Sequence, residues 1–146
     1  MTTDTTGTPK VTISFTVPVP STCNDRDGEG DIEAEHHTAK DDPQHLHKAH
    51  FQMDQDSCED QAPEHVDMED PDSGTKFHST HIDSVSFDNT ARALTITGTG
   101  LDNGVPVSFA AVAVDNGATA LDTFSIVLSD GYHNAGHLLG GAITLQ

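Results

Sequence analysis

The residues best suited to chemistry form an acidic run, DRDGEGDIE, at positions 25–33. Counted from the first aspartate, carboxylates stand at positions 1, 3 and 5, a glycine at 6 and an isoleucine at 8. This spacing is typical of loops that fold alternate side chains around one calcium ion, which takes oxygen ligands. It predicts calcium as the cofactor and a metal site made of Asp25, Asp27, Glu29, Asp31, Glu33 and His36.

Two features of this run differ from the helix–loop–helix calcium motif. His36 occupies position 12, where that motif has a bidentate glutamate, and the upstream TVPVPSTC cannot form the entering helix. The run is therefore either a bare calcium loop or a solvated acidic loop. Two further acidic turns, at 54–56 and 70–74, carry weaker signals of the same kind.

Histidines form a second group of candidate ligands, because five of the ten lie between His36 and His50. On a strand, His45 and His47 would share a face, so the segment makes zinc or copper a possible ligand. If the strands that contain His50 and His65 pair, one outer surface would carry His50, Asp54, His65, Asp67 and Glu69. The alternative is a polar sheet face that gains positive charge below about pH 6.5.

Catalysis has little support in the sequence. There is no GxSxG, HExxH or CxxC motif, and neither cysteine lies in a nucleophile context. Tryptophan is absent and Tyr132 is the one tyrosine, so the aromatic platforms of carbohydrate-binding sites are missing. We therefore expect a protein that is not an enzyme, with a carbohydrate-active domain as a remaining alternative.

Net charge limits the partners. The 146 residues carry a formal charge of −18, which repels phosphate backbones and argues against nucleic-acid binding. No apolar run approaches the roughly 18–20 residues of a membrane helix, so we expect no membrane insertion. Because like charges repel one another, stability should rise with added salt.

The elements that must position these residues are strands, because the dominant hydrophobic period is two. The clearest alternation lies at 10–19 and recurs around 49–53, 66–68, 94–97, 105–114 and 124–128. In the long strand expected over 75–87, Ile82 is out of phase with Phe77 and Val85, which predicts a bulge near 80–83. Short strands separated by Gly/Asn/Asp turns predict an all-β, antiparallel sandwich or barrel of about eight or nine strands.

The expected organisation is an N-terminal tail and strand at 1–20, followed by a single β-domain at 21–146 with an acidic, His-rich loop at 21–48. The start, MTTDTTGTPK, lacks the apolar region of a signal peptide, which fits a cytoplasmic protein or a mature secreted form. Cys23 and Cys58 form one bridge or remain two free thiols. The strand at 10–19 packs on its own domain or completes a neighbour's sheet.

The C-terminal sixty residues contain DNG at 115–117, DTFSI at 122–126 and GYHNAGHLLGGAITL at 131–145. This pattern resembles the post-COAP-1-type β-domain of secreted bacterial proteins, and a looser similarity extends upstream to Gly28. The chain departs from the family pattern in its histidines and acids and in the strand at 10–19. The resemblance implies an extracellular all-β accessory domain and no catalytic residues.

Together these observations predict a secreted or surface-displayed structural or binding β-module that self-associates as a homo-oligomer. In one form it is a filament subunit whose 10–19 strand pairs with a neighbour, and calcium neutralises its acidic loops. The first alternative is a His/Asp-rich protein that sequesters transition metals, and the second is a carbohydrate-active accessory domain or enzyme.

Overall fold

The computed structural model describes residues 26–33, 48–54 and 63–145, which form one closed antiparallel barrel. Each strand pairs with the next along the chain, and the last pairs with the first. The prediction of an all-β barrel or sandwich of about eight strands is confirmed. The strands are β1 (Arg26–Glu33), β2 (Lys48–Asp54), β3 (His65–Asp70), β4 (Thr75–Asp88), β5 (Ala93–Asp102), β6 (Val105–Val114), β7 (Thr123–Leu128) and β8 (His133–Leu145).

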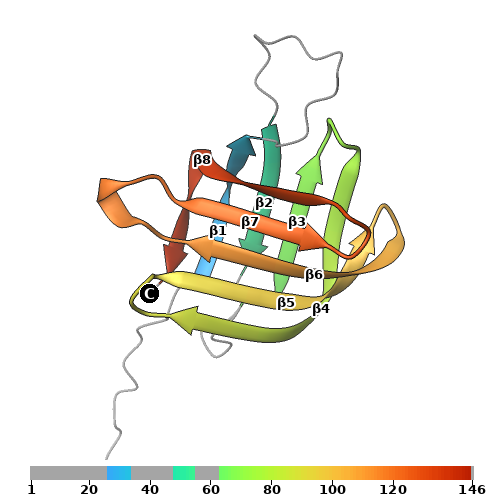
Figure 1. Cartoon of the computed structure of the whole chain (residues 1–146), viewed down its shortest axis with the longest axis horizontal. Coiled ribbons are helices and arrows are strands. Elements are labelled where there is room, and N and C mark those ends of the chain that lie inside the picture. Colours follow the sequence, from blue (N-terminus) through green and yellow to red (C-terminus); the bar gives the residue numbers. More distant parts are fainter. Residues whose placement is uncertain (1–25, 34–47, 55–62, 146) are drawn as a thin grey trace, which may run out of the picture.

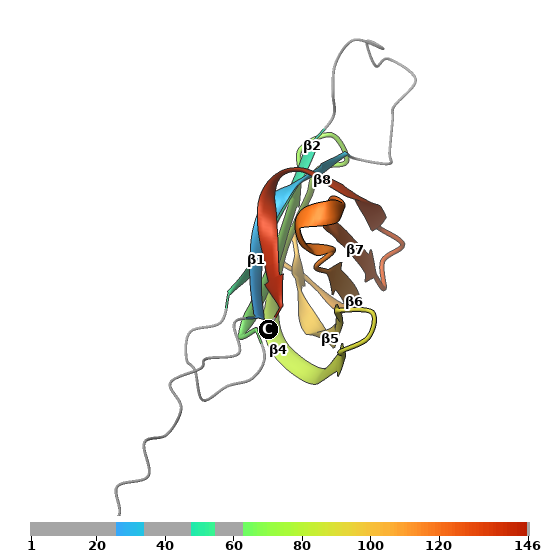
Figure 2. The same ribbon diagram turned by 90° about the vertical axis from the view of Figure 1, so that its left-hand side faces the viewer.

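Two long strands bend around the barrel and join its two layers (Figures 1 and 2). β4 pairs with β3 through residues 75–78 and with β5 through residues 77–88. β8 pairs with β7 through residues 133–137 and with β1 through residues 138–145. The barrel is therefore flattened, with β1–β3 in one layer and β5–β7 in the other.

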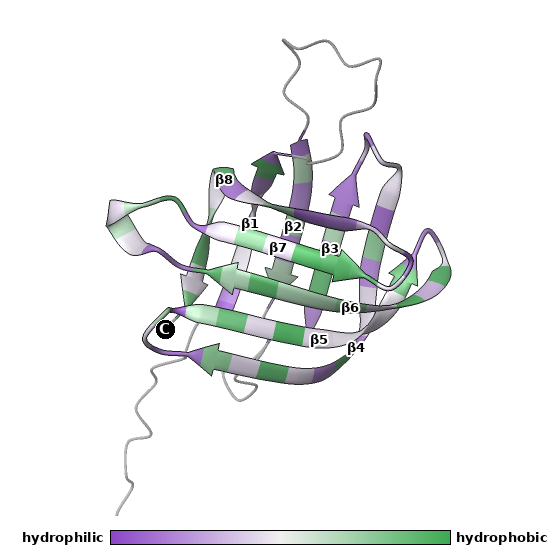
Figure 3. Ribbon diagram, viewed as in Figure 1, coloured by the Kyte–Doolittle hydropathy of each residue, from purple (hydrophilic) through white to green (hydrophobic). Residues whose placement is uncertain are grey.

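The interior is filled by side chains, as expected for a barrel of eight strands. Hydrophobic and hydrophilic residues alternate along most strands (Figure 3), so each strand sends one set of side chains inward. The rings of Phe51 and Phe124 stack across the two layers with centroids 4.0 Å apart, and Phe77 lies 5.1 Å from Phe109. Among the residues that the structure describes, twenty buried hydrophobic ones make up this core.

Two glycines in β5 make room for these rings. A Cβ atom on Gly98 would lie 2.8 Å from the ring of Phe109, and one on Gly100 would lie 2.6 Å from the ring of Phe77. Each would also come within 2.4 Å of a carbonyl oxygen of β4. Both positions therefore need glycine, because ring and backbone approach too closely for any side chain.

The bulge expected in the long strand is confirmed. The register between β4 and β5 shifts between Ser79 and His81 and again between Ile82 and Ser84. The extra residues change the phase of the alternation, so Ile82 and Val85 both pack against the core.

The acidic, His-rich loop predicted at 21–48 is wrong over residues 26–33, which form β1 between β2 and β8. Its inward positions include Gly28 and Gly30, whose Cβ atoms would lie 3.0–3.1 Å from side chains of Ile143, Met53 and Leu138. β1 lacks the alternation of apolar residues seen in the other strands because side chains of β2 and β8 fill the space inside these two glycines. The loop prediction is also wrong at Lys48, where β2 begins. Residues 21–25 and 34–47, the strand predicted at 10–19 and both cysteines lie outside the described residues.

The DNG and DTFSI residues fasten the turn between β6 and β7 to β8. Asp115 accepts hydrogen bonds from Gly117 N (2.8 Å) and Leu145 N (3.2 Å) and pairs with Arg92 (2.5 Å). Asp122 accepts from Asn116 N (2.8 Å) and Ile143 N (3.0 Å). These carboxylates satisfy backbone donors at the end of the barrel, so their role is structural.

The Phe51–Phe124 stack gives the first testable prediction. Phe124→Ala should lower the free energy of unfolding by about 3–5 kcal/mol, because it empties the centre of a filled interior. Val127→Ala, three residues along the same strand but 56% exposed, should cost less than about 1 kcal/mol. Urea unfolding followed by circular dichroism measures both, and equal losses would contradict the packing described here.

Asp115 gives a second prediction. Burial raises the pKa of its carboxyl, but the bonds from Arg92 and the backbone N–H groups outweigh burial and lower it overall. A lowered pKa adds stability that is present above about pH 4 and is lost as pH falls through the folded-state value.

Asp115→Asn should therefore lower the free energy of unfolding by about 1–3 kcal/mol at pH 7 and flatten its decline in acid. Asp88→Asn is the matched control. A single oxygen of Asp88 accepts the N–H groups of Thr90 and Ala91, and the amide oxygen of asparagine can accept both in its place. Chemical unfolding at pH 7 and pH 3 measures both variants. An unchanged acid dependence in Asp115→Asn would contradict the assignment.

Candidate binding surface

The outward side chains of β1–β4 form a continuous charged face, which we call the acidic wall. In a strand, residues two apart point to the same side, so every second residue contributes. The acidic wall has a formal charge of −5 with its three histidines neutral and −2 with all three protonated. Its members are Asp27, Glu29, Asp31, Glu33, Lys48, His50, Gln52, Asp54, His65, Asp67, Glu69, Lys76 and His78.

The predicted calcium ligands of β1 lie in a row on this wall. Asp27, Glu29, Asp31 and Glu33 point outward from consecutive alternate positions, about 6.7 Å apart along the strand. The turn that a calcium loop requires at Gly30 is absent, because Gly28–Glu33 pairs in regular register with β2. The loop conformation is therefore a wrong prediction for this segment, while Asp25 and His36 lie outside the described residues.

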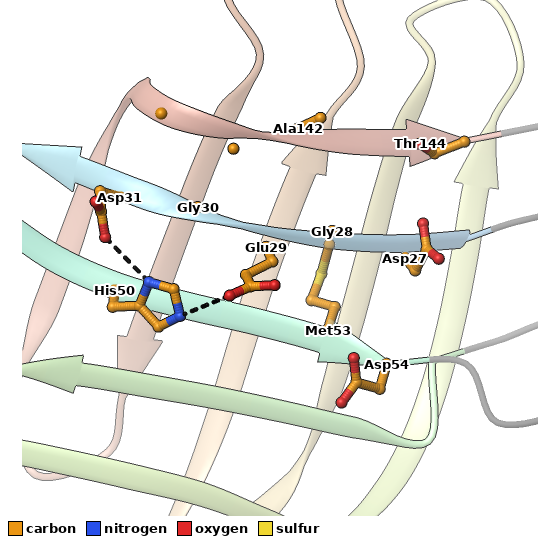
Figure 4. Close-up of a pocket in the computed structure, with 12 residues that line it drawn as sticks. Asp27, Gly28, Glu29, Gly30, Asp31, His50, Met53, Asp54, Ala142 and Thr144 are labelled. Atoms are coloured by element: carbon orange, nitrogen blue, oxygen red, sulfur yellow. Dashed lines mark hydrogen bonds and ion pairs between the residues drawn. The ribbon is translucent and has the colours of Figure 1, made fainter.

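His50 lies between two of these carboxylates (Figure 4). Its Nδ1 is 3.0 Å from Asp31 Oδ1 and its Nε2 is 3.4 Å from Glu29 Oε1. A neutral imidazole donates from one nitrogen only, whereas a protonated one donates from both. His50 can therefore donate to both carboxylates only when both of its ring nitrogens carry a proton.

The shared outer surface expected for the strands of His50 and His65 is confirmed. β2 and β3 are antiparallel, with His50 opposite Glu69, Gln52 opposite Asp67 and Asp54 opposite His65. The pattern continues into β4, where His78 Nδ1 lies 2.5 Å from Asp67 Oδ1. Imidazoles and carboxylates thus alternate across neighbouring strands, which reduces repulsion between the acids.

Two open grooves meet at His50. The first, of about 700 Å³, follows β1 between β2 and β8 and is lined by Asp27, Glu29, Asp31 and Asp54. Its β8 side consists of Gly140, Gly141, Ala142 and Thr144, so the groove exists because β8 has only small side chains there; Ala142 and Thr144 are labelled in Figure 4. The second, of about 380 Å³, lies over β2–β4. Both expose carboxylates to solvent and would attract cations or basic groups.

Metal coordination is not preformed on the acidic wall. Within residues 26–33, 48–54 and 63–145, no three His, Cys, Asp or Glu side chains converge as ligands of one ion. His45 and His47, the pair expected to offer zinc or copper ligands, lie outside these ranges.

The opposite layer has a different surface, which we call the neutral wall. β5, β6 and β7 are described in full, and none of their outward positions carries a charge. The members of the neutral wall are Ala93, Thr95, Thr97, Thr99, Leu101, Pro106, Ser108, Ala110, Val112, Val114, Thr123, Ser125 and Val127. The barrel thus has one acidic and one neutral side.

A buried polar cluster was missed in the sequence because its members look like turn residues. The Tyr132 hydroxyl donates to Asp70 Oδ2 at 3.1 Å and accepts from Asn134 Nδ2 at 3.2 Å. Burial, together with the nearby Asp70 carboxylate, raises the pKa of Tyr132. Asp70 Oδ1 also accepts the N–H groups of Asp72 and Ser73. The acidic turn at 70–74 therefore uses its carboxylate to fix the chain, with both Asp70 oxygens occupied by protein donors.

Comparisons with known proteins return no match, whether with family models, with curated proteins or with solved structures. Within the described residues there is also no helix long and apolar enough to cross a bilayer.

Gln52 offers a direct test of the acidic wall, because it stands opposite Glu29 on one side and Asp67 on the other. Gln52→Glu should lower the free energy of unfolding by about 0.5–1 kcal/mol at low salt, since it adds a third neighbouring carboxylate. Gln52→Lys should raise it by a similar amount. Both remove the Gln52 amide that donates to Asp54 Oδ2; a lysine at this position can pair with Asp54 whereas a glutamate repels it, so the difference between the variants is electrostatic.

Salt provides the control for this pair. At about 1 M NaCl the Debye length is about 3 Å, so the two variants should converge. Thermal unfolding at low and high salt measures the difference. Variants that remain equally far apart at both salt concentrations would show that charge on the acidic wall is not the cause.

Proposed function

We propose that the protein is a structural or binding module outside the cell that self-associates and acts through its outer surfaces. The observation that carries the proposal is the division of the barrel into an acidic wall on β1–β4 and a neutral wall on β5–β7. The interior is occupied by the core, so partners meet the outside of the strands.

The two walls suit different partners. The acidic wall repels a second acidic wall and attracts cations, so it faces solvent in an assembly. The neutral wall and its ends expose apolar side chains, with Val105, Leu121 and Val127 each more than half exposed. Exposed apolar residues on an otherwise strongly charged protein favour contacts between proteins.

Calcium, which we propose as the main divalent cation, neutralises the acidic wall as a counter-ion. The β1 carboxylates point away from the barrel. The two open grooves of the acidic wall are lined by solvent-exposed carboxylate oxygens. A charge of this density lowers the stability of the folded chain and opposes contact between copies, and both effects weaken as cations accumulate. Protonation of the histidines acts in the same direction.

Light scattering coupled to size exclusion tests this proposal. At pH 7 and about 0.15 M salt the particle mass should be a multiple of the 15.5 kDa chain, and it should fall at low salt because the acidic walls repel. Calcium and magnesium at matched ionic strength should restore it equally. A mass of one chain under every condition would overturn the proposed self-association. A strong preference for calcium would instead reveal a coordinated site.

A further inference from the structure

The second half of β4 is an open edge of the sheet. β3 pairs with β4 only through residues 75–78, and its last contact is the bond from Val66 N to Ser79 Oγ at 2.8 Å. From Thr80 to Asp88, β4 has β5 on one side and no paired strand among the described residues on the other. In Figure 1 this half forms the lower border of the front layer. An open edge presents unpaired backbone groups to any extended chain.

The two parts of this edge differ. Residues 80–83 contain both bulges and the charged pair His81–Asp83, with 3.4 Å between Nε2 and Oδ1. Bulges and charges hinder strand pairing. Ser84–Asp88, by contrast, keeps a regular register with β5. Its inward residues Val85 and Phe87 are only half-buried, although they pack against the core. This part can accept a strand that completes the core.

The chain contains a segment with the pattern such a strand needs. Residues 10–19, KVTISFTVPV, alternate strictly between apolar and polar positions. In that phase Ile13, Phe15 and Val17 would share one face and Ser14 and Thr16 the other. We infer that residues 10–19 of one copy add as a strand to the Ser84–Asp88 edge of a second copy, an inference that rests on the self-association proposed above.

The connection to β1 favours a second copy over the same chain. The Arg26 guanidinium lies 4.7 Å from the centre of the Phe87 ring, so β1 begins beside the C-terminal end of the open edge. Six residues join Val19 to Arg26 and reach at most about 25 Å, whereas a strand over residues 10–19 extends about 30 Å. Within one chain, antiparallel pairing of Val11–Phe15 with Ser84–Asp88 would put Val19 level with Thr80, about 23 Å from Phe87, so this linker would be almost fully extended. Parallel pairing would leave Val19 closer to the start of β1.

Parallel pairing within one chain gives a poor register. With Val19 level with Asp88, beside the start of β1, it would place Phe15–Val19 beside Ser84–Asp88, so Pro18, which lacks an N–H group, would stand in the pairing and residues 10–14 would lie beside the bulges. A segment from a second copy has no such restraint. It can pair antiparallel, which is the more stable arrangement, and bring Val11–Phe15 against the regular part of the edge.

A matched pair of substitutions in the full-length chain tests the inference. Phe15→Asp places a charge on the face that would cover Val85 and Phe87, and should reduce the particle mass to 15.5 kDa. Thr16→Asp adds the same charge on the outward face and should leave the oligomer intact. Circular dichroism of both variants should match the unmodified chain, because the described barrel contains neither residue.

Cross-linking between copies identifies the edge. In a Cys23→Ser/Cys58→Ser background that retains the oligomer mass, a Ser14→Cys chain is mixed with an isotope-labelled Ser86→Cys chain and oxidised. Mixed-mass dimers should form, because both residues face outward on adjacent strands. Thr95→Cys on β5, one strand further away, is the control and should give none.

The outcomes separate this inference from the proposed function. A Phe15→Asp variant that remains oligomeric, or cross-links as frequent with Thr95→Cys, would overturn the edge assignment and leave self-association through another surface. A cross-link that forms only within a chain carrying both Ser14→Cys and Ser86→Cys would overturn the exchange between copies. If the unmodified chain is a monomer, both proposals fail.

Discussion

Closure of eight strands into a narrow ring is the constraint on which the rest of the structure depends. A barrel of this size has room inside for side chains only, and the stacked rings of Phe51 and Phe124 already span the space between its layers. Because the strand period is two, closure assigns every second residue to the interior. Ionisable residues at the alternate positions are thereby placed outside. The acidic wall forms because the acids of β1, β2 and β3 occupy these outward positions.

The parts of the fold that alternation could predict are those with apolar inward residues. The phase of β2 and β3 correctly placed His50 and His65 on one outer surface, and the phase change at Ile82 predicted the bulge in β4. β1 was missed because Gly28 and Gly30 occupy inward positions and give no hydrophobic signal. Its glycines and carboxylates imitate a calcium loop, although the glycines serve to admit the side chains of neighbouring strands.

The buried polar residues could not have been predicted either. Asp70 and Asp115 look like ordinary turn residues, and only tertiary structure shows that they accept bonds from Tyr132 and Leu145, which are distant in sequence. Asn134 completes the cluster by donating to the buried Tyr132 hydroxyl. The same holds for the neutral wall. Its serines, threonines and valines are unremarkable one by one, and their meaning comes from the pairing of β5, β6 and β7 side by side.

Charge is distributed unevenly over this barrel, with the acidic wall on β1–β4 and the neutral wall on β5–β7. Copies that approach through their acidic walls repel each other, whereas the neutral wall and the adjoining edge of β4 carry far less charge. Contacts between copies are therefore expected on that side, with the acidic wall left to solvent and cations. If copies associate as proposed, protonation of the three histidines on the acidic wall would weaken the repulsion between copies.

The most direct measurement of the central claim is hydrogen exchange at the backbone amides of Gly28–Ile32 without calcium. If these residues form a strand between β2 and β8, their N–H groups donate alternately to the two neighbouring strands and exchange slowly, at rates that calcium does not change. Fast exchange that slows only when calcium is added would mean that the segment is an ion-binding loop, and the closed barrel with its acidic wall would be contradicted.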